Sequence, residues 1–117
     1  MSIDRATAEA MRDLFELVRD SAPLRQTRSE MHARAREWSR ALDTLAEMGD
    51  DWVIELAGAV TPYMSVAGIS YDGRPETHHV IRVIHRDGTC TVHAEDPIGQ
   101  ARYTNLHSPT SPVVVKA

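Results

Sequence analysis

Histidine is the residue type whose number and spacing most readily suggest chemistry in this sequence. Four of the six histidines fall within sixteen positions, at His78, His79, His85 and His93. Imidazole is a common ligand of zinc and iron, so converging histidines would predict a metal site. In an extended strand, however, His79 and His85 share a face but lie about 20 Å apart, and His78 points to the other face. A metal ion would need a ligand from elsewhere, such as Glu76 or His107, and we expect neither a metal nor another cofactor.

The single cysteine is the second candidate for chemistry. The dipeptide Asp87-Gly88 lies between two alternating β-branched segments and predicts a two-residue hairpin turn, which pairs His85 with Cys90 at about 5 Å between β-carbons. A thiol beside an imidazole can form a reactive ion pair. Cysteine also packs as a small apolar residue, and no third residue is marked to orient the histidine. We therefore interpret the His85–Cys90 pair as structural.

The same turn predicts the register of the whole hairpin. The further pairs are Arg86–Thr89, Ile84–Thr91, Val83–Val92, Arg82–His93, Ile81–Ala94 and Val80–Glu95. This register buries the Val83–Val92 and Ile81–Ala94 pairs on one face. A bulge at Gly88 would instead place Arg82 against Val92 and lose that apolar match. In the favoured register, the histidine-bearing hairpin offers a candidate partner or ligand surface at His78, Arg82 and His93.

Arginines give residues 25–40 a local charge of +3. This charge could attract a phosphate or an acidic partner, and helices followed by a hairpin are also typical of winged helix-turn-helix proteins. The helix expected here is too long for that motif, and the acidic pair Asp50-Asp51 lies where its recognition helix should begin. We expect a solvated helical face and no specific DNA binding, and keep Arg34, Arg36 and Arg40 as part of the candidate partner surface.

Two helices are expected to precede the hairpin. The first begins at Ser2 and continues to Asp20, with apolar side chains at helical spacing (Met11, Leu14, Phe15 and Val18). The second begins at the capping box Thr27–Glu30, ends at Gly49 and carries a heptad stripe (Met31, Ala35, Trp38, Leu42 and Leu45). These helices should form an antiparallel hairpin. Trp38, Leu42 and Leu45 are candidate contacts of a homodimer.

Residues 51–60 fit either a short helix or a strand, and we favour the helix. The chain then changes to extended segments at residues 63–71, 77–86, 89–94 and 113–115, and residues 97–112 are rich in turn formers. The sequence therefore predicts a single α+β domain over residues 1–117. Its helical layer covers residues 1–60, with a possible short third helix, and packs on a small antiparallel sheet formed by residues 63–116.

Composition narrows the class of protein. Of the 117 residues, 14 are alanine and only 24 are Leu, Ile, Val or Phe, so the core is thin and a homodimer is plausible. The net charge of −4 disfavours a protein built to coat DNA or anionic membrane.

No apolar run approaches the ~20 residues of a membrane span. The first nine residues lack the apolar stretch of a secretory signal peptide. One cysteine excludes an internal disulfide, so we expect the reducing cytoplasm.

Three functions follow as hypotheses. The first is a non-enzymatic protein-interaction module, acting as a small regulator or inhibitor, because no catalytic or cofactor motif is recognisable. The second is a small-molecule or metal-binding module, with an enzyme as one form of it, that uses the histidine-bearing hairpin. The third is a nucleic-acid binder that uses the arginine-rich second helix.

Overall fold

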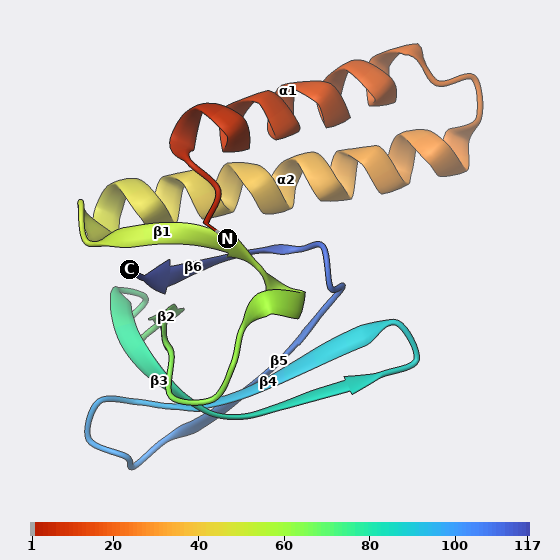
Figure 1. The fold of residues 1–117 in the computed structure, drawn as a ribbon. Coiled ribbons are helices and arrows are strands. Elements are labelled where there is room, and N and C mark those ends of the chain that lie inside the picture. The colour runs from red at the N-terminus through yellow and green to blue at the C-terminus, as the bar shows by residue number, and fades with distance from the viewer. Residues whose placement is uncertain (1) are drawn as a thin grey trace.

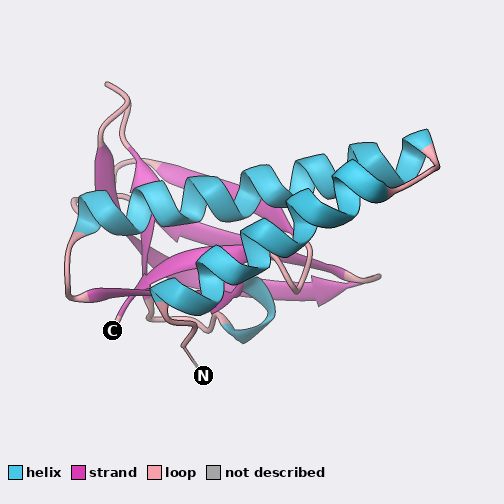
Figure 2. Cartoon of the chain, turned by 90° about the horizontal axis from the view of Figure 1, so that it is seen from above, coloured by secondary structure: helices cyan, strands magenta, loops and turns pink. Residues whose placement is uncertain are grey.

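The computed structural model describes residues 2–117 as two helices and six strands (Figure 1). The helices are α1 (Arg5–Ser21) and α2 (Arg25–Met48). The strands are β1 (Trp52–Leu56), β2 (Ser65–Ile69), β3 (Pro75–Arg86), β4 (Thr89–Glu95), β5 (Arg102–His107) and β6 (Pro112–Lys116). They form one antiparallel sheet in the order β1-β6-β2-β3-β4-β5, with both helices on one side (Figure 2). The predicted α+β fold, a helical hairpin followed by an antiparallel sheet, is confirmed.

Both helices begin at other residues than the sequence predicted. α1 is capped by Asp4 and not by Ser2, since the Thr7 amide donates to the Asp4 carboxylate at 2.7 Å. α2 begins at Arg25 and has no side-chain cap, so the predicted capping box of Thr27 and Glu30 does not form. The Arg28 guanidinium instead donates to two carbonyls of the connecting loop, those of Ala22 and Pro23, each at 3.0 Å. This bridge stabilises an earlier start of the helix.

Residues 51–60 form a strand and one 3-10 turn (Ala57–Ala59), and not the predicted short helix. β1 pairs along its whole length with β6, from Trp52–Lys116 to Leu56–Pro112. This pairing buries Ile54 completely. A helical spacing cannot compete when an apolar strand from the far end of the chain satisfies these backbone groups and covers Trp52 and Ile54. The helical layer therefore ends at Met48, and the sheet begins before residue 63.

The β3–β4 hairpin follows the predicted register from the turn as far as Arg82. Beyond Arg82, Ile81 is an extra residue on β3, and Val80 takes its place opposite Ala94. The predicted Ile81–Ala94 and Val80–Glu95 pairs are therefore wrong. Val80 is 1% exposed while Ile81 is 40% exposed, so the bulge exchanges which of the two side chains enters the core.

The bulge also changes which histidines share a face. Cross-strand partners lie on the same face, so His85 lies on the face of its partner Cys90, and Val80 lies on the face of Ala94. His78, two residues before Val80, lies on this inner face too. His79 lies on the outer face, and its predicted common face with His85 is wrong.

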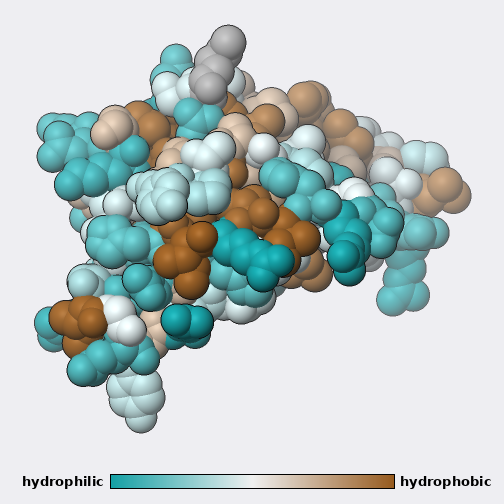
Figure 3. Space-filling model, turned by 60° about the horizontal axis from the view of Figure 1, so that its bottom comes forward, coloured by the Kyte–Doolittle hydropathy of each residue, from teal (hydrophilic) through white to brown (hydrophobic). Residues whose placement is uncertain are grey.

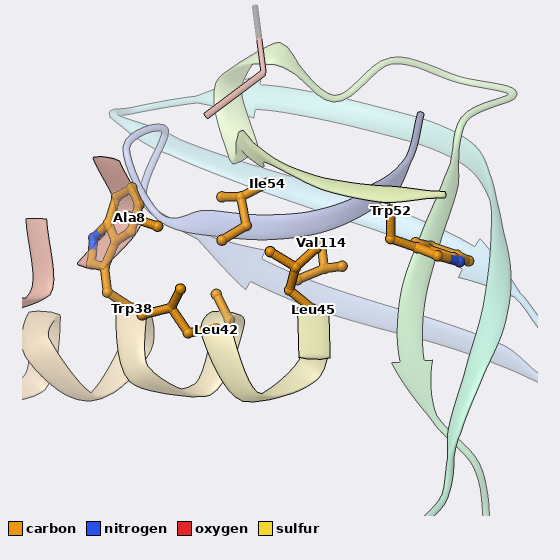
Figure 4. Close-up of a cluster of buried hydrophobic side chains, with 8 residues drawn as sticks. Ala8, Trp38, Leu42, Leu45, Trp52, Ile54 and Val114 are labelled. Atoms are coloured by element: carbon orange, nitrogen blue, oxygen red, sulfur yellow. The ribbon is translucent and has the colours of Figure 1, made fainter. Parts of the chain in front are cut away.

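The heptad stripe of α2 packs inside the chain. Trp38, Leu42 and Leu45 belong to one buried cluster, in which Trp38 lies beside Ala8 of α1, and Leu42 and Leu45 point from α2 toward Ile54 of β1 and Val114 of β6 (Figure 4). Their exposed fractions are 3%, 7% and 9%. A second copy of the chain cannot reach side chains this deeply covered, so the predicted dimer contact at these three residues is replaced by an intramolecular one. A homodimer through another surface stays a prediction.

The end of the helical hairpin extends past the strands (Figures 1 and 2). Leu14 and Leu17 of α1 and Leu24, which precedes α2, are more than half exposed. Within residues 2–117, no helix combines the length and apolar character needed to cross a membrane.

Candidate functional site

A groove lies beneath α2, where β2 and β6 separate. In residues 2–117 these strands share one registered pair, Val66–Val115. The groove has a volume of about 570 Å³. Its walls are consecutive residues of β2 (66–69), of β5 and the following loop (105–108) and of β6 (112–114), together with Glu37, Arg40, Ala41 and Thr44 of α2. Neighbouring side chains of a strand point to opposite faces of the sheet, so a groove above one face would be lined by alternate residues. Because consecutive residues line this groove, it runs along the edges of the strands.

A stacked pair of rings lines the inner end of the groove. The rings of His78 and Tyr103 are nearly parallel, with centroids 4.2 Å apart, and His78 Nε2 lies 2.8 Å from Glu76 Oε1. Gly68 makes room for the imidazole, because a β-carbon at this position would overlap the ring. His78 is 2% exposed, so its predicted place on the outer surface is wrong. The bare backbone of Gly68 is what allows the ring to lie inside.

β5 borders the groove as the last strand of the sheet, with no strand on its other side within residues 2–117. The Asp96 amide donates to the Ala101 carbonyl at 3.0 Å, so these two residues form a hydrogen-bonded pair where β4 meets β5. Every second residue repeats this bonding, so Tyr103, Asn105 and His107 direct their backbone groups toward β4. The amides and carbonyls of Thr104 and Leu106 therefore point away from the sheet.

The charged groups of the groove lie on its α2 side. Glu37 Oε2 accepts a hydrogen bond from Ser111 Oγ at 3.2 Å. Burial lowers the pKa of His107, and the nearby Glu37 carboxylate opposes this shift. Arg40 is exposed and makes no hydrogen bond or ion pair with any residue in the part of the chain that the structure describes. The groove thus carries one carboxylate that already accepts a hydrogen bond from Ser111 and one cation without a bonded partner among the described residues.

The three arginines of the candidate partner surface do not lie together. Arg34 is half-buried, with its guanidinium carbon 6.0 Å from the centre of the Phe15 ring of α1. Arg36 and Arg40 are exposed on another side of α2, and of the three only Arg40 lines the groove. The single arginine patch expected from the sequence is therefore divided between two sides of the helix.

Arg82 and His93 pair on the outer face of the sheet, as predicted. His93 Nδ1 lies 3.1 Å from Thr104 Oγ1 of β5, and His79 Nδ1 lies 3.3 Å from Ser65 Oγ of β2. The underside of the molecule, opposite the helices, is mainly polar around a smaller apolar patch (Figure 3). His78 is separated from this surface by the thickness of the sheet, so the three residues do not form one site.

The predicted pairing of His85 with Cys90 is confirmed in register. Cys90 is completely buried, and its Sγ donates to the Ala57 carbonyl at 3.3 Å. Burial raises the pKa of the thiol. His85 is exposed beside the turn. The thiol thus has the environment of a packed core residue.

We expect Cys90 to react slowly with iodoacetamide in the folded protein and rapidly after denaturation, because the thiol is buried and protonated. Cys90→Ser should lower the free energy of unfolding by about 1–3 kcal/mol, since it places a hydroxyl in an apolar site. Alkylation rates followed by mass spectrometry, with and without urea, test this. Fast alkylation of the native protein that His85→Ala slows would contradict a structural role.

The histidines do not converge on a metal. Among residues 2–117, no three His, Cys, Asp or Glu side chains are grouped so that they could hold a metal ion. Glu76 contacts His78, whereas His79 and His93 bond to hydroxyls on the outer face.

Sequence reasoning missed Gly68, Tyr103 and Asn105. Residues 97–112 were expected to be turn-rich, but they contain β5. Tyr103, Asn105 and His107 follow a spacing of two, which is the signal of one strand face and could have revealed this strand. No signal within β2 distinguished Gly68 from a turn glycine.

No protein-family model matches this chain, no curated protein matches its sequence, and no solved structure matches its fold. The groove itself is therefore the basis for a functional proposal.

Proposed function

We propose that this chain is a small protein-interaction module that binds a segment of a partner protein in the groove beneath α2. The observation that carries the proposal is the groove itself, which is bordered by strand edges and by one helix. Ala41, Val66 and Val113 supply apolar walls, and Arg40 and Asn105 supply polar groups. Apolar walls with a few polar groups are typical of recognition sites. Covering a segment of another protein is how a small cytoplasmic regulator or inhibitor would act.

A displayed library of random peptides of about twelve residues is a suitable probe of this function. The full chain serves as bait, and selected peptides are then synthesised and titrated against the folded protein. Thr44 is half-buried on the groove wall, so Thr44→Arg places a long side chain in the groove. We expect this variant to weaken peptide binding by about tenfold or more.

Ala33→Arg is the matched control, because it adds the same side chain at an exposed position of α2 outside the groove. Binding to this variant should stay within about twofold of the original protein. A library that yields no binding peptide would overturn the proposed function. Equal losses in the two variants would mean that the peptides bind elsewhere.

A further inference from the structure

We propose that the bound segment is an extended peptide that adds as a seventh strand to the free edge of β5 and directs a carboxylate at Arg40. This inference rests on the proposed function and specifies the chemistry of its partner. Main-chain hydrogen bonds to β5 would provide affinity, and side chains at alternate positions would provide selectivity.

The edge of β5 is open to such pairing. Thr104 and Leu106 direct backbone groups away from β4, and both residues are exposed. Proteins normally protect an edge strand with proline, lysine or a covering segment. β5 (Arg102–His107) contains neither proline nor lysine, whereas the opposite edge is covered by the Ile3 amide, which donates to the Ile54 carbonyl of β1 at 2.7 Å. Within residues 2–117 the Ile3 bridge occupies one outer edge of the sheet, whereas no strand pairs with the free side of β5, which borders the groove. The facing edges of β2 and β6 also line the groove, but these two strands already share the Val66–Val115 pair.

The groove has room for one strand. An added strand lies about 4.8 Å from its neighbour. The consecutive wall residues 105–108 show that the groove runs along β5, and its volume of about 570 Å³ suits a short peptide segment and not a second folded sheet. Leu106, which is 70% exposed, would gain an apolar cover from the incoming segment.

Charge favours a partner segment over a second copy of this chain. Arg40 has no partner within residues 2–117, so a carboxylate on the added strand would complete an ion pair. β5 itself carries no carboxylate, so a second copy that paired through its own β5 would offer Arg40 none from the added strand. The expected occupant is therefore an extended segment that combines apolar residues with an acidic one.

Leu106→Pro tests the strand addition directly. Proline removes the outward-pointing amide of Leu106 and leaves the bonds between β4 and β5 intact, as edge strands permit. Leu106→Ala keeps that amide and removes only the apolar contact. With a peptide selected from the random library, we expect Leu106→Pro to bind at least about tenfold more weakly than Leu106→Ala. Circular dichroism and thermal unfolding verify that both variants fold.

A second measurement keeps the test independent of proline's effect on the fold. Only alternate residues of the peptide would form main-chain hydrogen bonds with β5. Methylation of the backbone nitrogens of these residues should therefore abolish binding, whereas methylation of the backbone nitrogens between them should leave it unchanged. Arg40→Gln should weaken binding and reduce its dependence on salt. Equal binding to the Leu106→Pro and Leu106→Ala variants, with no effect of methylation, overturns strand addition while the proposed function stands. A dimer of the free protein that Leu106→Pro dissociates would instead identify a second copy as the occupant.

Discussion

Trp38→Ala is expected to lower the free energy of unfolding by about 3–5 kcal/mol. The indole is 3% exposed and packs between α1 and the β1–β6 part of the sheet, where Ala8, Ile54 and Leu42 surround it. Truncation leaves a cavity that these helical and strand residues cannot all move to fill. The total free energy of unfolding of a domain of this size is about 5–15 kcal/mol, so the variant should be close to unfolding at room temperature. Urea denaturation followed by circular dichroism measures the change.

Leu17→Ala provides the control for this loss. Leu17 lies near the C-terminal end of α1 and is 65% exposed. Its truncation should change the free energy of unfolding by less than about 0.5 kcal/mol. If Trp38→Ala and Leu17→Ala have similar effects, Trp38 does not contribute to the core as described.

Gly68→Ala is expected to be the second most harmful substitution, with a loss of about 2–3 kcal/mol. The new methyl group would overlap the imidazole of His78, which the Tyr103 stack and the Glu76 hydrogen bond hold in place. The ring must move, and the Glu76 carboxylate then loses its partner. Thermal unfolding and denaturant titration measure the loss, and the same shift should reduce peptide binding in the groove.

A double-mutant cycle isolates this cause. In a His78→Ala background the ring is absent, so Gly68→Ala should cost less than about 0.5 kcal/mol or stabilise slightly by restricting the unfolded chain. Gly68 has no positive φ angle, so alanine suits its backbone. If Gly68→Ala is equally harmful in both backgrounds, the imidazole is not the obstacle.

Local signals predicted much of the fold. The heptad stripe from Ala35 to Leu45 and the stop at Gly49 predicted α2 and its buried face. The turn at Asp87-Gly88 predicted five cross-strand pairs correctly. Each of these features depends on residues close in the sequence, where spacing and turn chemistry decide the structure.

The remaining features depend on contacts between distant segments. Residues 51–60 fit a helix or a strand, and the pairing of β1 with β6, more than fifty residues away, decides for the strand. The groove exists because β2 and β6 separate after a single pair, while β5 and α2 close its other sides. His78 was expected on the surface because strand alternation was counted without the extra residue at Ile81. Candidate sites that need three or more elements cannot be assembled from spacing alone.

The bulge at Ile81 divides β3 into two segments in which side chains alternate between the two faces of the sheet in opposite order. Residues 75–80 and residues 82–86 belong to one continuous backbone, yet the rule for which side chains point inward reverses between them. The choice of inward-facing residues in the segment next to the groove is therefore independent of that choice in the segment next to the turn. His78 occupies the inner position, and His79 the outer one, only because Ile81 is inserted between them and the turn. The number of residues in the strand thus selects which of two adjacent imidazoles faces the groove.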